Sequence, residues 1–135
     1  MGRRQQDATW VNSLMQTLQG HSVLIGGDFN AWHTTWGYPR NNSRGTQLLV
    51  AMRHTRLELL NVPEVPTRIA AFASQRDTTP DLTWASPNLR GIWQTRPDTL
   101  GSDHLPIWIT LQALQAIPEN DRPFRKMGYI SYHPK

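Results

Sequence analysis

The chain of 135 residues contains no cysteine. Disulfide bonds, thiolate metal sites and a cysteine nucleophile are therefore excluded. The sequence also lacks any apolar run near the roughly 20 residues that a membrane-spanning helix requires, and its polar first residues contain no apolar segment of a secretory signal. We therefore expect an intracellular protein, nuclear or cytoplasmic, without a membrane partner.

Lysine is scarce, since two Lys stand against twelve Arg, and the formal net charge is +4. Arginine is the better residue for bidentate contacts with phosphate. A basic balance of this kind favours a nucleic-acid partner, although an ordinary basic protein has the same charge. The sequence has neither a zinc-binding histidine pattern nor an EF-hand loop, so a bound metal would use scattered oxygen ligands.

A chain of this length supports one domain with its own core. Helical spacing of apolar residues predicts amphipathic helices over residues 8–19 and 45–56. Short apolar or β-branched segments, ended by Gly or Pro, predict strands over residues 22–26, 57–61, 67–72, 81–85, 92–95 and 105–111. Helices interleaved with strands favour an α/β fold. The polar, proline-rich residues 118–135 are predicted to be a tail or linker after a domain spanning residues 1–117.

An acid and an amide follow the first predicted strand, in Gly26-Gly27-Asp28-Phe29-Asn30. Because strand side chains alternate, Asp28 and Asn30 project to the same side if the extended geometry continues. A carboxylate there could deprotonate water or hold a cation, beside an amide that donates to a phosphate oxygen. Gly, Asp and Asn also favour turns, so a purely structural turn is the alternative.

Two further polar clusters border predicted strands downstream. Asp103 and His104 precede the last strand, where a protonated His104 could stabilise a phosphoryl group or position the nucleophile. Asp81 begins another strand and is the candidate carboxylate that fixes the imidazole tautomer. The alternatives are a backbone cap by Ser102 or Asp103 beside a surface histidine, and a turn at Thr-Pro-Asp. We predict that all three clusters meet in one site.

Other polar residues are weaker candidates. His33 lies in the long aromatic loop 31–42, where it could act chemically or simply lie at the surface. Scattered arginines usually lie on a solvated face, but three could meet a phosphate backbone: Arg40, Arg44 and Arg53. Carboxylate and amide oxygens suit Mg²⁺ or Mn²⁺, and Mg²⁺ needs only one or two carboxylates besides substrate and water.

The ordered set Gly-Asp-Phe-Asn (27–30), Thr-Pro-Asp-Leu-Thr (79–83) and Ser-Asp-His (102–104) resembles the endonuclease/exonuclease/phosphatase superfamily, which includes deoxyribonuclease I and exonuclease III-type enzymes. The wider context of the first two motifs is most similar to the endonuclease domain of arthropod non-LTR retrotransposons. The resemblance covers roughly residues 7–112. It implies a four-layered α/β sandwich and Mg²⁺-dependent hydrolysis of phosphodiester bonds (Mn²⁺ is the other candidate). It also implies nicking of target DNA to prime reverse transcription, with a reverse transcriptase domain in the full-length protein.

The resemblance also implies a role for each matching residue. Asp28 would activate the attacking water, and Asn30 would bind the scissile phosphate. Asp103 would sit beside the metal or support it, so that Asp28, Asn30 and Asp103 are the implied metal ligands. His104, paired with Asp81, would contact the phosphate and stabilise the pentacovalent transition state.

Two further residues are expected to contact the substrate. Thr67, in Val-Pro-Thr-Arg, resembles a family hydroxyl near the phosphate, and Arg44 is expected to meet the phosphate backbone.

The family's amino-terminal half supplies a metal-binding Glu, but no matching Glu precedes Asp28. The resemblance thus implies the carboxyl-terminal half of such a domain, with one sheet face exposed and weak or no activity alone. The alternatives are a non-catalytic nucleic-acid-binding remnant and a small-molecule phosphatase of the same superfamily.

Overall fold

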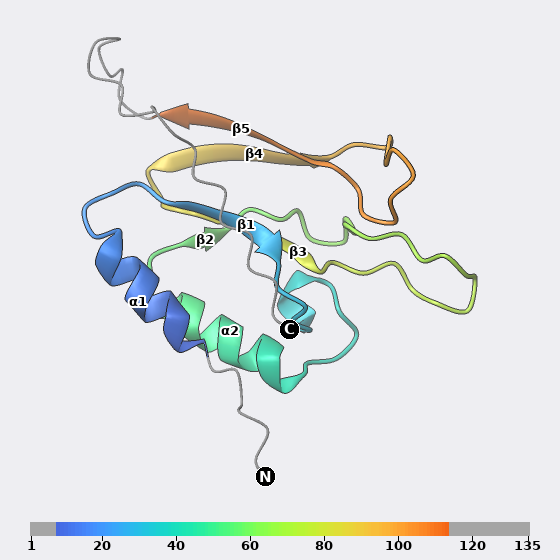
Figure 1. Ribbon diagram of the computed structural model, residues 1–135, viewed down its shortest axis with the longest axis horizontal. Helices are drawn as coiled ribbons and strands as arrows, with labels where there is room; N and C mark the ends of the chain where they lie inside the picture. Colours follow the sequence, from blue (N-terminus) through green and yellow to red (C-terminus); the bar gives the residue numbers. More distant parts are fainter. Residues whose placement is uncertain (1–7, 114–135) are drawn as a thin grey trace.

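The computed structural model describes residues 8–113, and the structural statements below concern this part of the chain. Its elements follow one another as α1 (Thr9–Thr17), β1 (Leu24–Asp28), the 3₁₀ helix η1 (Thr34–Trp36), α2 (Ser43–Arg53), β2 (Glu58–Leu59), β3 (Asp81–Ala85), β4 (Leu89–Thr95) and β5 (Ile107–Ala113) (Figure 1). Within residues 8–113, neither α-helix has the length and apolar character needed to cross a bilayer.

The central sheet has three strands in the order β1–β3–β2, and both pairings are antiparallel. Asp28 at the carboxyl end of β1 is therefore the register partner of Asp81 at the amino end of β3. Because the pairing is antiparallel, this edge of the sheet brings the end of one strand beside the start of another.

Strands β4 and β5 form a separate antiparallel hairpin, with Thr95 paired to Ile107 at the end that leads into the loop before β5. Figure 1 shows α1 and α2 on one side of the three-stranded sheet and the hairpin on the other. A methyl group added to Gly91 of β4 would lie 2.8 Å from the Leu60 side chain, so the hairpin packs closely against the end of β2. The described residues therefore form layers of helices, sheet and hairpin.

The core lies mainly between the helices and β3. Val11 of α1 and Met52 of α2 are almost fully buried, as are Leu82 and Trp84 of β3. Four of the five residues of β3 are buried, which is the pattern of a strand covered on both faces. This burial holds the rest of β3, which follows Asp81, in place.

Helix α2 begins two residues earlier than predicted, because Asn42 caps it. The Asn42 side-chain oxygen accepts hydrogen bonds from the backbone N–H groups of Gly45 (2.7 Å) and Trp32 (3.0 Å). A Cβ atom at Gly45 would lie 1.8 Å from the Trp32 carbonyl oxygen, so only glycine fits there. The cap and this close approach fix the loop that runs from β1 to α2.

The predicted strand over residues 67–72 is wrong. Its only ladder contacts are isolated bridges from Arg68 to Thr78 and to His104. The backbone N–H of Ala70 donates to the Asp77 carboxylate rather than to a neighbouring strand, and a turn follows at residues 72–75. The strand over 81–85 is confirmed, the other elements shift by a few residues, and the predicted tail 118–135 lies outside the described residues.

Candidate active site

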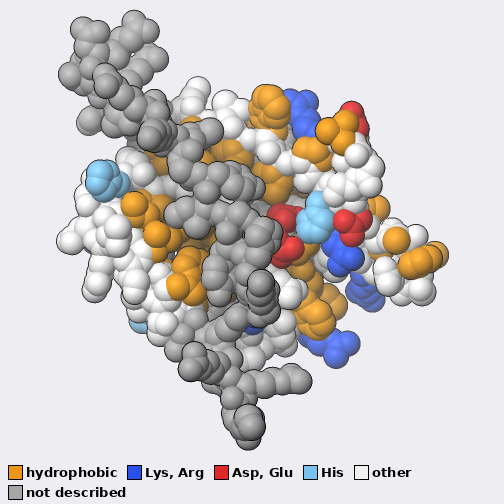
Figure 2. Space-filling model, in the orientation of Figure 1, with side chains coloured by type: hydrophobic (Ala, Val, Ile, Leu, Met, Phe, Trp, Pro, Cys, Tyr) orange, Lys and Arg blue, Asp and Glu red, His pale blue; other side chains and the backbone are white. Residues whose placement is uncertain are grey.

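Asp28 and Asp81 face each other across the β1–β3 ladder. Residues directly opposite in an antiparallel pair project to the same face, and two like charges placed so are destabilising. Ligand atoms of Asp28, Asp81 and His104 all lie within 4.8 Å of one another. The prediction that the three polar clusters meet is therefore confirmed. Figure 2 shows a histidine between acidic side chains on this surface, with basic side chains beside it.

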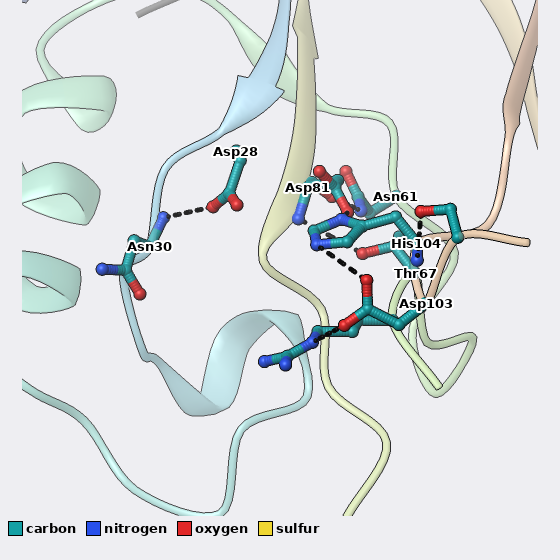
Figure 3. Close-up of polar contacts among 9 residues, drawn as sticks. Asp28, Asn30, Asn61, Thr67, Asp81, Asp103 and His104 are labelled. Atoms are coloured by element: carbon teal, nitrogen blue, oxygen red, sulfur yellow. Dashed lines mark hydrogen bonds and ion pairs between the residues drawn. The ribbon is translucent and has the colours of Figure 1, made fainter. Parts of the chain in front are cut away.

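His104 is held by a direct contact with Asp81. Its Nδ1 lies 2.7 Å from Oδ2 of Asp81, and both side chains are largely shielded, with 35% and 17% of their surfaces exposed (Figure 3). An ionised carboxylate only accepts hydrogen bonds, so Nδ1 carries the proton in this contact. The backbone N–H of His104 donates to the Ser102 hydroxyl at 3.1 Å. The contact with Asp81 sets the tautomer and orients the ring, and the contact with Ser102 holds the backbone.

Asp28 also closes a local turn. Its Oδ1 accepts a hydrogen bond from the backbone N–H of Asn30 at 2.9 Å, and Asn30 has a positive φ of 45°. The extended geometry therefore ends at Asp28, and the Asn30 carboxamide is directed away from the Asp81–His104 pair (Figure 3). This motif therefore forms a turn and also contributes to the site, because the turn orients the Asp28 carboxylate.

Asp103 lies at the border of the site and is paired with Arg68. The Arg68 Nε donates to Asp103 Oδ2 at 2.9 Å, while Asp103 Oδ1 lies 4.0 Å from His104 Nε2. The hydrogen bond from the Arg68 guanidinium lowers the pKa of Asp103 below its usual value. Sequence reasoning missed Arg68, although it directly follows Thr67 in Val-Pro-Thr-Arg.

The two residues predicted to contact substrate, Thr67 and Arg44, lie in different surroundings. Thr67 is fully buried, and its hydroxyl accepts a hydrogen bond from the backbone N–H of Asp81 at 3.2 Å. Without exposed surface, Thr67 supports Asp81 from behind, and this geometry gives no support to a direct contact with substrate. Arg44 is half-buried in the first turn of α2, and its contact with a phosphate backbone stays a prediction.

Tyr38 is a neighbour of the site that sequence reasoning did not select. Burial raises the pKa of the Tyr38 hydroxyl. The negative charges of Asp28 and Asp81 raise it further, while a hydrogen bond with the Thr78 side chain lowers it in part. Its ring stacks on Trp32 with centroids 6.0 Å apart. The only signal in the sequence was the density of aromatic residues in loop 31–42.

His33 has a structural role in the same loop. Its Nδ1 accepts a hydrogen bond from the backbone N–H of Thr35 at 3.0 Å, which caps η1, and its ring lies against Trp36. Burial lowers the pKa of His33, and the positive charge of Arg53 adds to this shift. The loop conformation therefore depends on a neutral imidazole.

Comparison with known proteins agrees with this geometry. Residues 3–108 match the family described as endonuclease-reverse transcriptase. The chain belongs to this family. A probable RNA-directed DNA polymerase from transposon BS of Drosophila melanogaster is 33% identical over 102 residues, which are 69% of this chain and 10% of that protein. The resemblance derived from the three sequence motifs is thereby confirmed.

A solved structure is also similar to this member of the endonuclease-reverse transcriptase family. It is the endonuclease domain of TRAS1, a telomere-specific non-LTR retrotransposon, with a TM-score of 0.64 and 22% sequence identity over 79% of this chain and 52% of that chain. The predicted α/β fold of the deoxyribonuclease I type is confirmed. The chain spans about half of the solved domain and about a tenth of the Drosophila protein.

Proposed function

We propose that this chain carries catalytic residues of a metal-dependent DNA endonuclease, a hydrolase that cleaves phosphodiester bonds. One observation carries the proposal. Three clusters far apart in the sequence bring Asp28, Asp81 and His104 within 4.8 Å of one another at one sheet edge. Membership of the endonuclease-reverse transcriptase family supports the same chemistry.

Each residue has a role that fits its contacts. The exposed Asp28 carboxylate orients and deprotonates the attacking water, while the Asn30 N–H keeps that carboxylate in place. His104, held by Asp81 through Nδ1, presents Nε2 to the phosphoryl group; in its protonated form, with an N–H on both ring nitrogens, it stabilises the charge that develops there. Contact of the Asn30 carboxamide with the scissile phosphate remains a prediction.

The residues of this edge fit a hard divalent cation such as Mg²⁺ or Mn²⁺. Two carboxylates placed opposite each other repel, and a cation between them would remove that repulsion. Asp28 and Asp81 are the side chains best placed to hold it, with Asn30 and Asp103 as the further ligands that the family resemblance implies. A bound Mg²⁺ would supply Lewis-acid stabilisation of charge on the phosphoryl oxygens.

DNA is the substrate that the surface favours. The net charge is positive, and Arg68 lies directly beside the site through its contact with Asp103. The similar proteins are a transposon polymerase and a retrotransposon endonuclease domain. We therefore propose that the nick primes reverse transcription, with a reverse transcriptase domain in the full-length protein.

Nicking of supercoiled plasmid in Mg²⁺ or Mn²⁺ tests the proposal, because a single cut per plasmid is visible. We expect slow, metal-dependent nicking that falls about 100-fold or more in Asp28→Asn and His104→Ala. Glu58→Gln is the matched control, since it removes an exposed carboxylate from β2 and should leave nicking unchanged.

Two outcomes would replace the proposal. Salt-sensitive DNA binding without turnover, unaffected by metal or by Asn30→Ala and His104→Ala, would indicate a non-catalytic nucleic-acid-binding remnant. Release of phosphate from a small phosphomonoester without any nicking would indicate a phosphatase.

A further inference from the structure

We propose that Asn61 is the positioning residue of the Asp81–His104 pair, acting through the backbone of β3. For its effect on catalysis this inference rests on the proposed endonuclease function, but its structural part does not. Asn61 is buried, with 8% of its surface exposed, and lies just after β2. It belongs to none of the three motifs that the sequence analysis selected.

The Asn61 side chain continues the β2–β3 ladder after β2 has ended. Strand β2 pairs with β3 over two residues only, and Leu60 adds one more backbone hydrogen bond to the Thr83 carbonyl at 2.8 Å. Beyond that point the Asn61 carboxamide bonds to the backbone of β3, where a longer β2 would have done so. Its Oδ1 accepts from the Thr83 N–H at 2.8 Å, and its Nδ2 donates to the Asp81 carbonyl at 2.9 Å. Two backbone groups of a buried strand are thus satisfied by one side chain.

Asp81 needs this support because it is the first residue of β3. On one side, β3 is held by its pairing with β1, with Asp28 as the register partner of Asp81. On the other side no strand reaches Asp81, and side chains hold its peptide groups instead: Asn61 the carbonyl and Thr67 the N–H. Strand ends without such partners open most easily.

The Asp81 carboxylate orients the His104 ring, because their side chains meet at 2.7 Å. Loss of the Asn61 carboxamide leaves the Asp81 carbonyl and the Thr83 N–H without their present partner. The start of β3 then shifts or takes up water, and the carboxylate moves with it. A displacement near 1 Å is enough to cost about 100-fold in rate when catalytic groups are involved.

The chain offers a matched control at the opposite end of the same strand. Ser86 directly follows β3, is equally buried at 9% exposure, and its hydroxyl accepts a hydrogen bond from the Val23 N–H at 2.7 Å. Asn61→Ala and Ser86→Ala each remove a buried side-chain contact with the sheet backbone. They should therefore lower the melting temperature similarly, while only Asn61→Ala affects the site.

The first test uses the full 135-residue chain, and it needs neither metal nor DNA because it reads the state of the His104 ring directly. Long-range ¹H–¹⁵N spectra of the imidazoles show which ring nitrogen of His104 carries the proton. We expect the Nδ1–H form in the wild type and in Ser86→Ala, and a mixture of tautomers in Asn61→Ala. Nicking should fall about 10- to 100-fold in Asn61→Ala, with an unchanged KM for DNA. Where Asn61→Ala does not fold, Asn61→Asp serves, since it keeps an acceptor for the Thr83 N–H and replaces the donor to the Asp81 carbonyl by a carboxylate oxygen that cannot donate.

An unchanged His104 tautomer in a folded Asn61 variant would overturn the proposal, as would an equal change in Ser86→Ala. The absence of nicking in the wild type would contradict activity of this chain on its own, while the spectra would still decide the role of Asn61.

Discussion

His104 Nδ1 and Asp81 Oδ2 lie 2.7 Å apart, although the two residues are separated by 23 positions in the sequence. The contact joins the first residue of β3 to the loop before β5. Because the ionised carboxylate only accepts, the proton stays on Nδ1, and Nε2 is the nitrogen available to a substrate. The same carboxylate faces Asp28 across the β1–β3 ladder.

Asp81→Asn should separate activity from stability. The amide removes the charge that stabilises a protonated His104, so nicking should fall about 100-fold. It also removes one of two like charges that face each other, so the free energy of unfolding should stay the same or rise. Plasmid nicking and urea unfolding of the same preparation measure both. A large loss of stability would indicate that Asp81 is mainly a structural residue.

Arg68→Met should raise the pKa of Asp103 toward its ordinary value, because the hydrogen bond from the guanidinium is the main cause of its lowering. Carboxyl ¹³C shifts recorded against pH measure this directly. The stabilisation that comes with the lowered pKa is fully present above the ordinary pKa of a carboxyl group. It is lost as the pH falls through the pKa of Asp103 in the folded protein. The effect on unfolding should be small, since both side chains are about half exposed. An unmoved Asp103 titration would contradict the pairing.

Stability should fall as the pH drops below about 6.5, because the pKa of His33 is lowered in the fold and its Nδ1 must stay unprotonated to accept from Thr35. Stabilisation by the neutral ring is present above the ordinary histidine pKa and is lost as the pH falls through the folded-state value. His33→Asn keeps an acceptor at the cap without a titrating group and should flatten this dependence. Urea unfolding at several pH values tests it, with His21→Asn as an exposed control; an unchanged slope in His33→Asn would refute the assignment.

Tyr38→Phe should change the alkaline stability of the protein. Burial raises the pKa of the Tyr38 phenol. The neutral phenol therefore stabilises the folded protein fully below about pH 10, and this stabilisation is lost as the pH rises through the pKa of Tyr38 in the folded protein. The variant also loses the hydrogen bond with Thr78, which should cost about 1 kcal/mol at neutral pH. Absorbance titration of phenolate and unfolding at pH 8 to 11 follow both effects. A Tyr38 phenol that titrates like a free tyrosine would contradict the burial.

The sequence was sufficient for features that depend on local pattern. The apolar and β-branched residues of Asp81–Ala85 predicted β3, and polar residues at strand borders predicted that Asp28, Asp81 and His104 would meet. The strand expected over residues 67–72 failed because its partners are single residues, with no continuous neighbouring strand for its backbone. Such pairing depends on the tertiary fold and not on β propensity.

The sequence pattern did not identify the residues that support the site. Asn61, Arg68 and Tyr38 act through contacts with residues distant in the sequence, and none stands in a pattern that marks it. The turn at Asn30 was among the expected alternatives, but its positive φ, which directs the carboxamide away from His104, follows only from the folded backbone.

A double-mutant cycle on metal-dependent plasmid nicking tests most directly whether Asp28, Asp81 and His104 form one catalytic site. Groups that act as a unit are strongly non-additive, so removing the second costs little once the first is gone. We predict that Asp28→Asn with His104→Ala is no slower than the slower single variant, while Glu58→Gln retains wild-type nicking. Losses that multiply, or nicking that survives both substitutions, would contradict a shared site.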